Sequence, residues 1–199
     1  MKSLLLVLSG FLLFASCVQS QDMPLSTILV ENESWKLAKT DQLPVEKVPV
    51  LKVKIPLESP GVFGLWKDGG TLVVADKSDY HLWAYRVQYD EQKSICQLDA
   101  GDKCYAMQVA PGQKKLEVTA MASDSMNRFY AATPAGIQIF DPGARLAGVM
   151  VNPSKNPISQ MGFISSGGDA EDLIIVKAGS EVFTRKLQIK SNKPVPAKK

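Results

Sequence analysis

Short apolar runs separated by polar turns recur through most of the chain, and three segments share one arrangement. Residues 71–87, 128–148 and 172–189 each pair an apolar run with a turn and a second run in which apolar and polar positions alternate. The middle segment holds a Pro-Ala-Gly turn at 134–136 and an Asp-Pro-Gly turn at 141–143. This spacing is typical of antiparallel hairpins, and its recurrence indicates an internal repeat.

Helical periodicity is not sustained anywhere, so we predict an all-β fold of antiparallel strands. The strands expected from the apolar and alternating runs are 62–66, 72–76, 82–88, 104–109, 118–123, 128–133, 137–140, 147–152, 159–164, 173–177 and 181–190. A further alternating run at 48–55 could form one more strand.

The repeats predict a β-propeller-like fold. A propeller blade has four strands in about 40 to 45 residues, and the repeats begin near Gly61, Val118 and Ser159. The chain therefore predicts about three to four blades of a propeller that is incomplete or truncated at its N-terminal side. Residues 25–57 could add strands of a fourth blade or cover a sheet edge. Uncovered edges invite pairing with another chain, so self-association through open sheet edges is also expected.

The first twenty residues predict a signal peptide. Lys2 gives a basic start, and the apolar run at 4–14 is short for a membrane span. Two processing outcomes remain open. One is cleavage after Ser20, and the other is lipidation of Cys17, because the sequence FASC at 14–17 is similar to a bacterial lipobox. Both predict an exported protein that is secreted, periplasmic or lipid-anchored to the membrane.

The rest of the chain divides by composition. We expect a poorly legible N-terminal segment at 21–57, a propeller-like domain at 58–190 and a flexible basic tail at 191–199 that is rich in Pro and Lys. The formal net charge is +3, and the basic residues are dispersed apart from that tail. A nucleic-acid partner is not expected, because it requires a clustered basic face.

Two cysteines remain after the signal peptide. Cys96 and Cys104 lie in a polar stretch that reads as a loop. In an exported chain they predict either a loop-closing disulfide or two inert thiols. A metal site is not expected from them, because two thiols without a neighbouring third ligand do not complete a tetrahedral set.

Several short motifs carry a resemblance to a known family. They are DGGTLVVAD at 68–76, the stretch 128–148 with GIQIFDP at 136–142, PIS at 157–159 leading to Phe163, and EVF at 181–183 with Arg185 and Lys186. In this order they make residues 60–190 resemble the C-terminal half of the gluconolactonase and senescence-marker-protein (regucalcin-like) family, with exported bacterial members as the nearest likeness.

The resemblance implies a six-bladed propeller with a divalent cation on its axis, which polarises a lactone carbonyl and activates water. The positions that match the family's metal ligands carry Gly61, Thr119 and Gln160, where the family has asparagine, aspartate and asparagine. Carboxylate and amide oxygens suit Ca²⁺, Mg²⁺ or Mn²⁺, so the resemblance implies a degraded metal site. Asp76 and Asp124 could substitute as ligands, with turn capping as the alternative.

These observations predict a protein without catalytic residues or a cofactor, which acts as a module that binds a ligand or a protein partner. The first alternative is a hydrolase of sugar lactones that depends on Ca²⁺, Mg²⁺ or Mn²⁺ in a rebuilt site. The second alternative is a structural subunit that pairs through its sheet edges. A membrane contact is expected only through a lipid anchor on Cys17.

Overall fold

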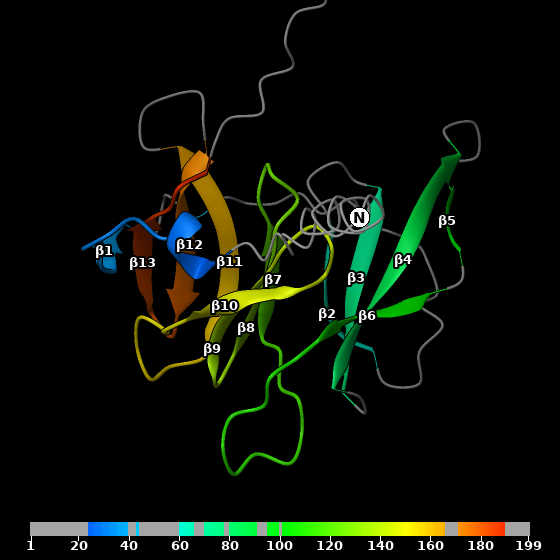
Figure 1. Cartoon of the computed structure of the whole chain (residues 1–199), viewed down its shortest axis with the longest axis horizontal. Coiled ribbons are helices and arrows are strands. Elements are labelled where there is room, and N and C mark those ends of the chain that lie inside the picture. Colours follow the sequence, from blue (N-terminus) through cyan, green and yellow to red (C-terminus); the bar gives the residue numbers. More distant parts are fainter. Residues whose placement is uncertain are drawn as a thin grey trace, which may run out of the picture.

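The computed structural model describes residues 24–39, 43, 60–65, 70–77, 80–90, 95–99, 101–165 and 171–189. This part of the chain contains one short 3-10 helix, η1 (Leu25–Thr27), and thirteen strands (Figure 1). The strands form three separate antiparallel sheets. The predicted signal peptide with Cys17, the run at 48–55 and the basic tail at 191–199 lie outside the described residues.

The first sheet has the strand order β2-β3-β4-β5, and β6 also pairs with β4. Its strands are β2 (Pro60–Leu65), β3 (Thr71–Asp76), β4 (His81–Asp90), β5 (Ile95–Leu98) and β6 (Asp102–Ala106). β3 is apolar on both faces: Val73 and Ala75 belong to one buried cluster, and Leu72 and Val74 belong to another. This explains why β3 reads as a continuous apolar run instead of an alternating one.

The second sheet is a simple meander with the order β10-β9-β8-β7. Its strands are β7 (Ala120–Ser123), β8 (Phe129–Thr133), β9 (Gly136–Phe140) and β10 (Leu146–Met150). Every residue of the first three of these strands is buried. The turn between β8 and β9 closes at the pair Thr133 and Gly136, where Gly136 has a φ of 130° that an L side chain rarely adopts.

The outer strand of the third sheet is β1, which comes from the N-terminal part of the chain, whereas the other three strands come from its C-terminal part. The strand order is β1-β13-β12-β11, with β1 (Lys36–Ala38), β11 (Ile158–Ser165), β12 (Glu171–Ala178) and β13 (Glu181–Lys186). β1 pairs antiparallel with β13, and Leu37 lies opposite Phe183. The N-terminal segment therefore covers a sheet edge, and the boundary expected at residue 57 does not separate β1 from the blades.

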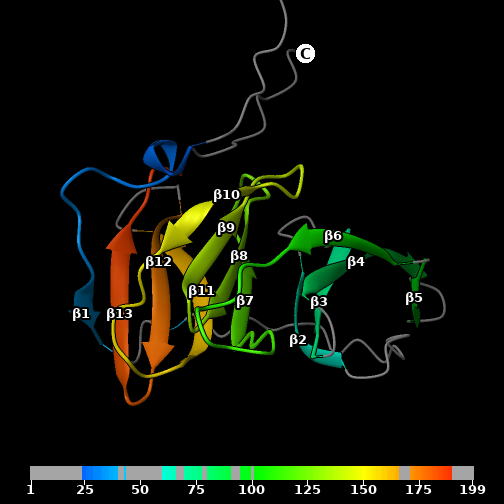
Figure 2. The same ribbon diagram turned by 60° about the horizontal axis from the view of Figure 1, so that its bottom comes forward.

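Residues 24–38, called the strap below, cross from the second sheet to the third. Leu25 packs against Gly148 of β10, where a Cβ on the glycine would lie 2.9 Å from the Cβ of Leu25. Ile28 is fully buried, and its carbonyl accepts a hydrogen bond of 2.8 Å from the Gln188 backbone N–H. The Gln188 side chain donates to the Leu29 carbonyl, 159 residues away in sequence. Figure 2 shows the strap in blue, running from beside β10 to β1 beside β13.

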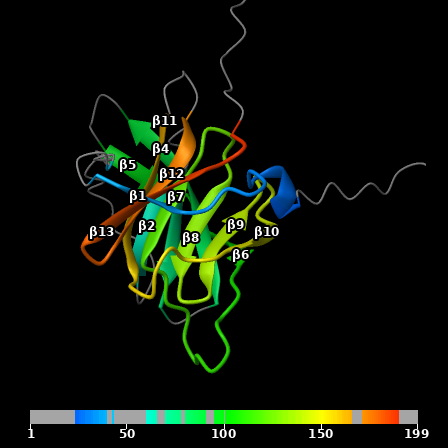
Figure 3. The ribbon, with the colours of Figure 1, turned by 90° about the vertical axis from the view of Figure 1, so that its left-hand side faces the viewer.

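The sheets pack face to face around their first strands. β7 contacts both β2 and β11, so the three strands that open the sheets lie side by side, in the order β11, β7 and β2 in Figure 2. Figure 3 shows the three sheets one behind another, along the direction in which they stack. One buried cluster lies between the first and second sheets, and a larger one between the second and third. Gly64 of β2 permits the close approach to β7, because its Cβ position is 3.1 Å from the Met121 Cβ. The described residues form a sector of three propeller blades, which confirms the all-β, propeller-like prediction.

Each of the eleven strands predicted in 62–190 corresponds to an observed strand, with ends that differ by a few residues. β1 and β5 were not predicted. Within the described residues, no helix has the length and apolar character that a membrane span needs.

The predicted disulfide between Cys96 and Cys104 is wrong for this fold. Cys96 lies opposite Tyr89 of β4, whereas the residue before Cys104 pairs with Trp83 of the same strand. That step along β4 is about 20 Å, and the two Cα atoms of a disulfide lie within about 7 Å of each other. Cys104 is a free and exposed thiol. Partial burial and the nearby Asp102 carboxylate raise its pKa, which makes it a poor nucleophile.

Candidate functional site

The three positions that match the family's metal ligands lie at the starts of the first strands of the blades. Gly61 has no side chain, and the place of its Cβ is 3.1 Å from the Ala75 carbonyl oxygen. The Thr119 hydroxyl donates a long hydrogen bond of 3.5 Å to the Ala132 carbonyl. Gln160 is exposed on β11. These positions supply no carboxylate, so this donor set does not fit a divalent cation that prefers charged oxygen ligands.

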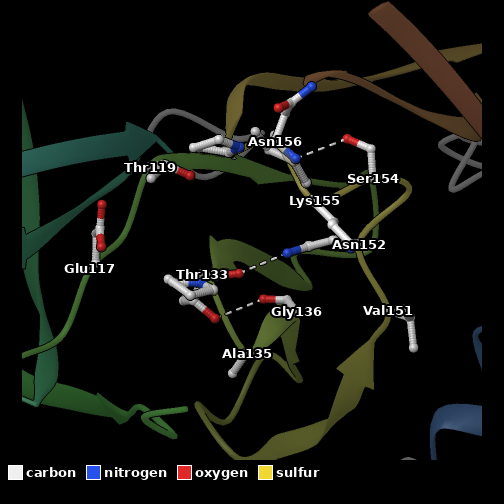
Figure 4. Close-up of a pocket in the computed structure, with 13 residues that line it drawn as sticks. Glu117, Thr119, Thr133, Ala135, Gly136, Val151, Asn152, Ser154, Lys155 and Asn156 are labelled. Atoms are coloured by element: carbon white, nitrogen blue, oxygen red, sulfur yellow. Dashed lines mark hydrogen bonds between the residues drawn. The ribbon is translucent and has the colours of Figure 1, made fainter. Parts of the chain in front are cut away.

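Two cavities of about 560 Å³ each open at this end of the blades. The first lies between the second and third blades, as Figure 4 shows, and is lined by Glu117, Thr119, Thr133, Pro134, Ala135, Gly136, Val151, Asn152, Ser154, Lys155, Asn156, Pro157 and Ile158. The second lies between the first and second blades and is lined by Gly61, Val62, Ala75, Asp76, Lys77, Lys115, Leu116, Glu117 and Val118. Glu117 lines both cavities.

Hydrogen bonds fix the wall of the first cavity (Figure 4). The Thr133 hydroxyl donates to the Gly136 carbonyl at 2.8 Å, and the Asn152 side-chain amide donates to the Thr133 carbonyl at 3.0 Å. The turn between β8 and β9 is thereby joined to the loop that follows β10. Glu117 and Lys155 are exposed, and neither has an ion-pair partner within the part of the chain that the structure describes. Both charges are available to a ligand.

A buried amide holds the segment that carries Glu117. The Gln138 side chain of β9 is fully buried. Its Nε2 donates to the Gln108 carbonyl at 2.6 Å, and its Oε1 accepts from the Gln108 backbone N–H at 2.8 Å. At the other end of the same segment, the Tyr80 hydroxyl donates to the Lys114 carbonyl at 2.8 Å. These contacts attach residues 107–118 to the first two blades.

Sequence reasoning missed both Glu117 and Gln138. A glutamine within the apolar run of β9 was the available signal, because a buried side-chain amide requires partners. Glu117 gave no signal, since a single glutamate in a lysine-rich loop reads as a solvated residue.

Asp124 does not lie at this site. It follows β7 at the far end from Thr119, and its side chain is fully buried. Its carboxylate accepts hydrogen bonds from the Met126 and Arg128 backbone N–H groups, from the Arg128 Nε at 2.5 Å and from the Tyr130 hydroxyl at 3.0 Å. These four hydrogen bonds occupy both carboxylate oxygens and cap the turn, so Asp124 is not a substitute metal ligand. Burial and the Asp124 carboxylate raise the pKa of Tyr130 well above its ordinary value.

The same turn recurs between β9 and β10. Asp141 Oδ1 accepts from the Arg145 backbone N–H at 3.0 Å, and the Arg145 Nε donates to Asp141 Oδ2 at 2.8 Å. In both turns the residue before the arginine has a positive φ, 57° at Asn127 and 64° at Ala144. The spacing Asp-x-x-x-Arg is therefore a repeated structural device. The two copies differ in burial, since the Arg128 side chain is 1% exposed and that of Arg145 is 53% exposed.

Asp76 is the sequence-predicted carboxylate that does reach a cavity. It ends β3 opposite Pro60, is buried, and lines the second cavity with Gly61. Burial, together with the Asp76 carboxylate, raises the pKa of Tyr85. The structure thus brings Gly61 and Asp76 to one cavity and Thr119 to the other, and Gln160 and Asp124 line neither.

No protein-family model matches the chain, and no curated protein matches it. Among solved structures, the chain is similar to a calcium-binding regucalcin from Agrobacterium tumefaciens, with 13% identity and a TM-score of 0.50 over 68% of this chain and 48% of that one. It is also similar to a gluconolactonase from Xanthomonas campestris, with 17% identity and a TM-score of 0.48 over 66% and 38%, and to a luciferin-regenerating enzyme, with 12% identity and a TM-score of 0.47 over 68% and 47%.

These structural neighbours are proteins of the gluconolactonase and regucalcin family, as the resemblance in sequence predicted. At 13% identity and a TM-score of 0.50, the match to the regucalcin supports the fold and nothing beyond it. The chain spans less than half of the length of each of these neighbours.

Proposed function

We propose that this chain is an exported propeller-type protein that binds a small polar ligand or a partner group at its paired cavities, without the metal-dependent lactone chemistry that the family resemblance implies. The observation that carries the proposal is the residue set at the blade starts. Gly61 provides no ligand, and Thr119 and Gln160 are neutral. Nothing in that set can balance the charge of a divalent cation.

The cavities support a binding role. Both are concave, and Glu117 stands between them. The first combines apolar wall residues such as Pro134 and Ile158 with the polar groups of Thr119 and Asn156. Polar groups that converge in a concave site can orient a polar ligand.

Calcium and manganese titration by calorimetry, with lactone hydrolysis assayed in parallel, tests the proposal on the mature chain. We expect neither heat of binding nor turnover. The same titration is made on the triple variant G61N, T119D and Q160N, which restores the residue types of the family at the three blade starts. We expect this variant to bind the cations more tightly than the unmodified chain. Micromolar binding with metal-dependent turnover in the unmodified chain would overturn the proposal.

One observation favours the alternative of a metal-dependent lactonase. Asp76 and Glu117 both line the second cavity, so two carboxylates are present at the correct end of the blades. Within the described ranges, however, no three His, Cys, Asp or Glu residues gather closely enough to hold a metal ion. If the unmodified chain does bind metal, D76N and E117Q should each abolish that binding.

Export is part of the proposal, with the two processing routes still to be separated. Mass spectrometry of the mature protein distinguishes cleavage after Ser20 from an acylated Cys17. An unprocessed N-terminus would contradict export.

A further inference from the structure

Two of the three large apolar side chains that are exposed in the described part of the chain lie together at the strap. Leu37 is 70% exposed and Val151 is 76% exposed, whereas the third, Tyr80, lies on the first blade and is 48% exposed. Trp35 joins the two, because its Nε1 donates a 2.8 Å hydrogen bond to the Val151 carbonyl. Leu37 follows Trp35 by two residues, about 7 Å along an extended chain. We call Trp35, Leu37 and Val151 the apolar patch.

The apolar patch is not explained by folding. Single exposed apolar residues are common, but neighbouring ones indicate an interaction surface. Trp35 is half-buried and packs against the core between the second and third blades. Leu37 and Val151 extend from this anchor into solvent, so polar residues at these two positions would leave the core unchanged.

The N-terminal end of the strap lies on β10, the strand that leads to Val151 of the apolar patch. Leu25, the second residue of the strap, packs on Gly148, which precedes Val151 by three residues. Cys17 lies seven residues before Pro24. Seven residues reach at most about 25 Å when fully extended. A lipid on Cys17 would therefore hold this face of the protein close to the membrane.

We propose that the apolar patch docks on the lipid bilayer to which Cys17 is anchored. Tryptophan with neighbouring aliphatic residues is the composition that inserts at a membrane interface. A single lipid anchor binds reversibly, and a second contact makes the attachment stable. Lys39 and Lys155 follow the two exposed residues closely in sequence and are themselves exposed, which suits anionic headgroups. The docking rests on the proposed export by the route that acylates Cys17.

Vesicle co-sedimentation tests this contact separately from lipidation. The mature chain carrying C17S, which cannot be acylated, is mixed with vesicles of phosphatidylethanolamine and phosphatidylglycerol. We expect measurable binding that falls by roughly 10-fold or more in the double variant L37D and V151D, since each change removes an inserted side chain and adds a repelled charge. A106D, which adds one charge at an exposed position of β6 in the first blade, is the control and should bind as the parent does.

Three results would overturn the proposal. The C17S chain could fail to bind the vesicles, the double variant L37D and V151D could bind as well as the parent, or A106D could lose as much binding as the double variant. If the double variant instead converts a dimer to a monomer in analytical ultracentrifugation while vesicle binding is absent, the apolar patch pairs copies of the chain. Mass spectrometry of the unmodified chain reports on Cys17 independently, so loss of the export proposal and loss of the docking proposal are distinguishable.

Discussion

The paired Asp-x-x-x-Arg turns allow the energetic effect of burial to be measured within one molecule. Replacing Arg128 by Met removes the guanidinium from Asp124 and retains the backbone N–H groups and the Tyr130 hydroxyl that also bond that carboxylate. Replacing Arg145 by Met makes the same change at Asp141, in a turn of the same geometry.

The two substitutions should differ greatly in cost. Arg128 and Asp124 are almost completely buried, and removing one partner of a buried pair costs about 3–5 kcal/mol, because the other charge stays in a poorly solvated site. Arg145 is 53% exposed, and an ion pair of that kind contributes about 0–1 kcal/mol. In a protein of this size each kcal/mol lowers Tm by about 2–4 °C. We therefore expect a loss of about 6–20 °C for R128M and at most about 4 °C for R145M.

Thermal and urea unfolding monitored by circular dichroism provide the measurement. The double variant D124N and R128M is the control, because it removes the stranded charge and keeps a capping oxygen, and it should be more stable than R128M alone. Equal losses in R128M and R145M would refute the argument, since they would show that burial of the first pair contributes nothing beyond the turn itself.

Three further predictions follow from single contacts. Tyr130 has a raised pKa in the folded state. The stability that its neutral hydroxyl contributes is therefore complete below the unfolded pKa of about 10 and declines as the pH rises above that value. The free energy of unfolding of Y130F, measured by urea titration between pH 9 and about 11, should decline less than that of the parent. The Gln138 side chain is hydrogen-bonded to both backbone groups of Gln108. Q138L should therefore lower the free energy of unfolding by about 1–3 kcal/mol and speed tryptic cleavage in the 107–118 segment. An unchanged cleavage rate would contradict the anchoring role. Gly148 lies against Leu25, so G148V should increase amide exchange in the strap while leaving exchange in β3 unchanged.

Much of the fold could be predicted because most strands pair with the next strand along the chain, through a short turn. The turns at Pro134 and Pro142 lie between apolar runs of strand length. Apart from β1 with β13 and β4 with β6, the observed pairings join strands that are neighbours in sequence. Asp124 fits the same logic, since an aspartate that starts a tight turn is more often a cap than a ligand. Turn capping was the alternative stated for it, and the hydrogen bonds confirm it.

What could not be predicted depends on contacts between residues far apart in sequence. β1 has three residues, with Lys36 and Leu37 both exposed, so it shows no alternation, and only β13 makes it a strand. The disulfide failed for a related reason. Cys96 and Cys104 are close in sequence, but β4 is long enough to pair with β5 and β6 at separate places. Glu117 lines both cavities only because two blades meet beside it.

The pairing of β1 with β13 also sets the order in which this protein can be completed. Among the described strands, β1 comes first along the chain and its partner β13 comes last. The first two blades can form from strands that are close in sequence, but the third cannot gain its outer strand until β13 is present. Contacts of such long range slow folding, so we expect the pairing of β1 with β13 to be a late step in refolding.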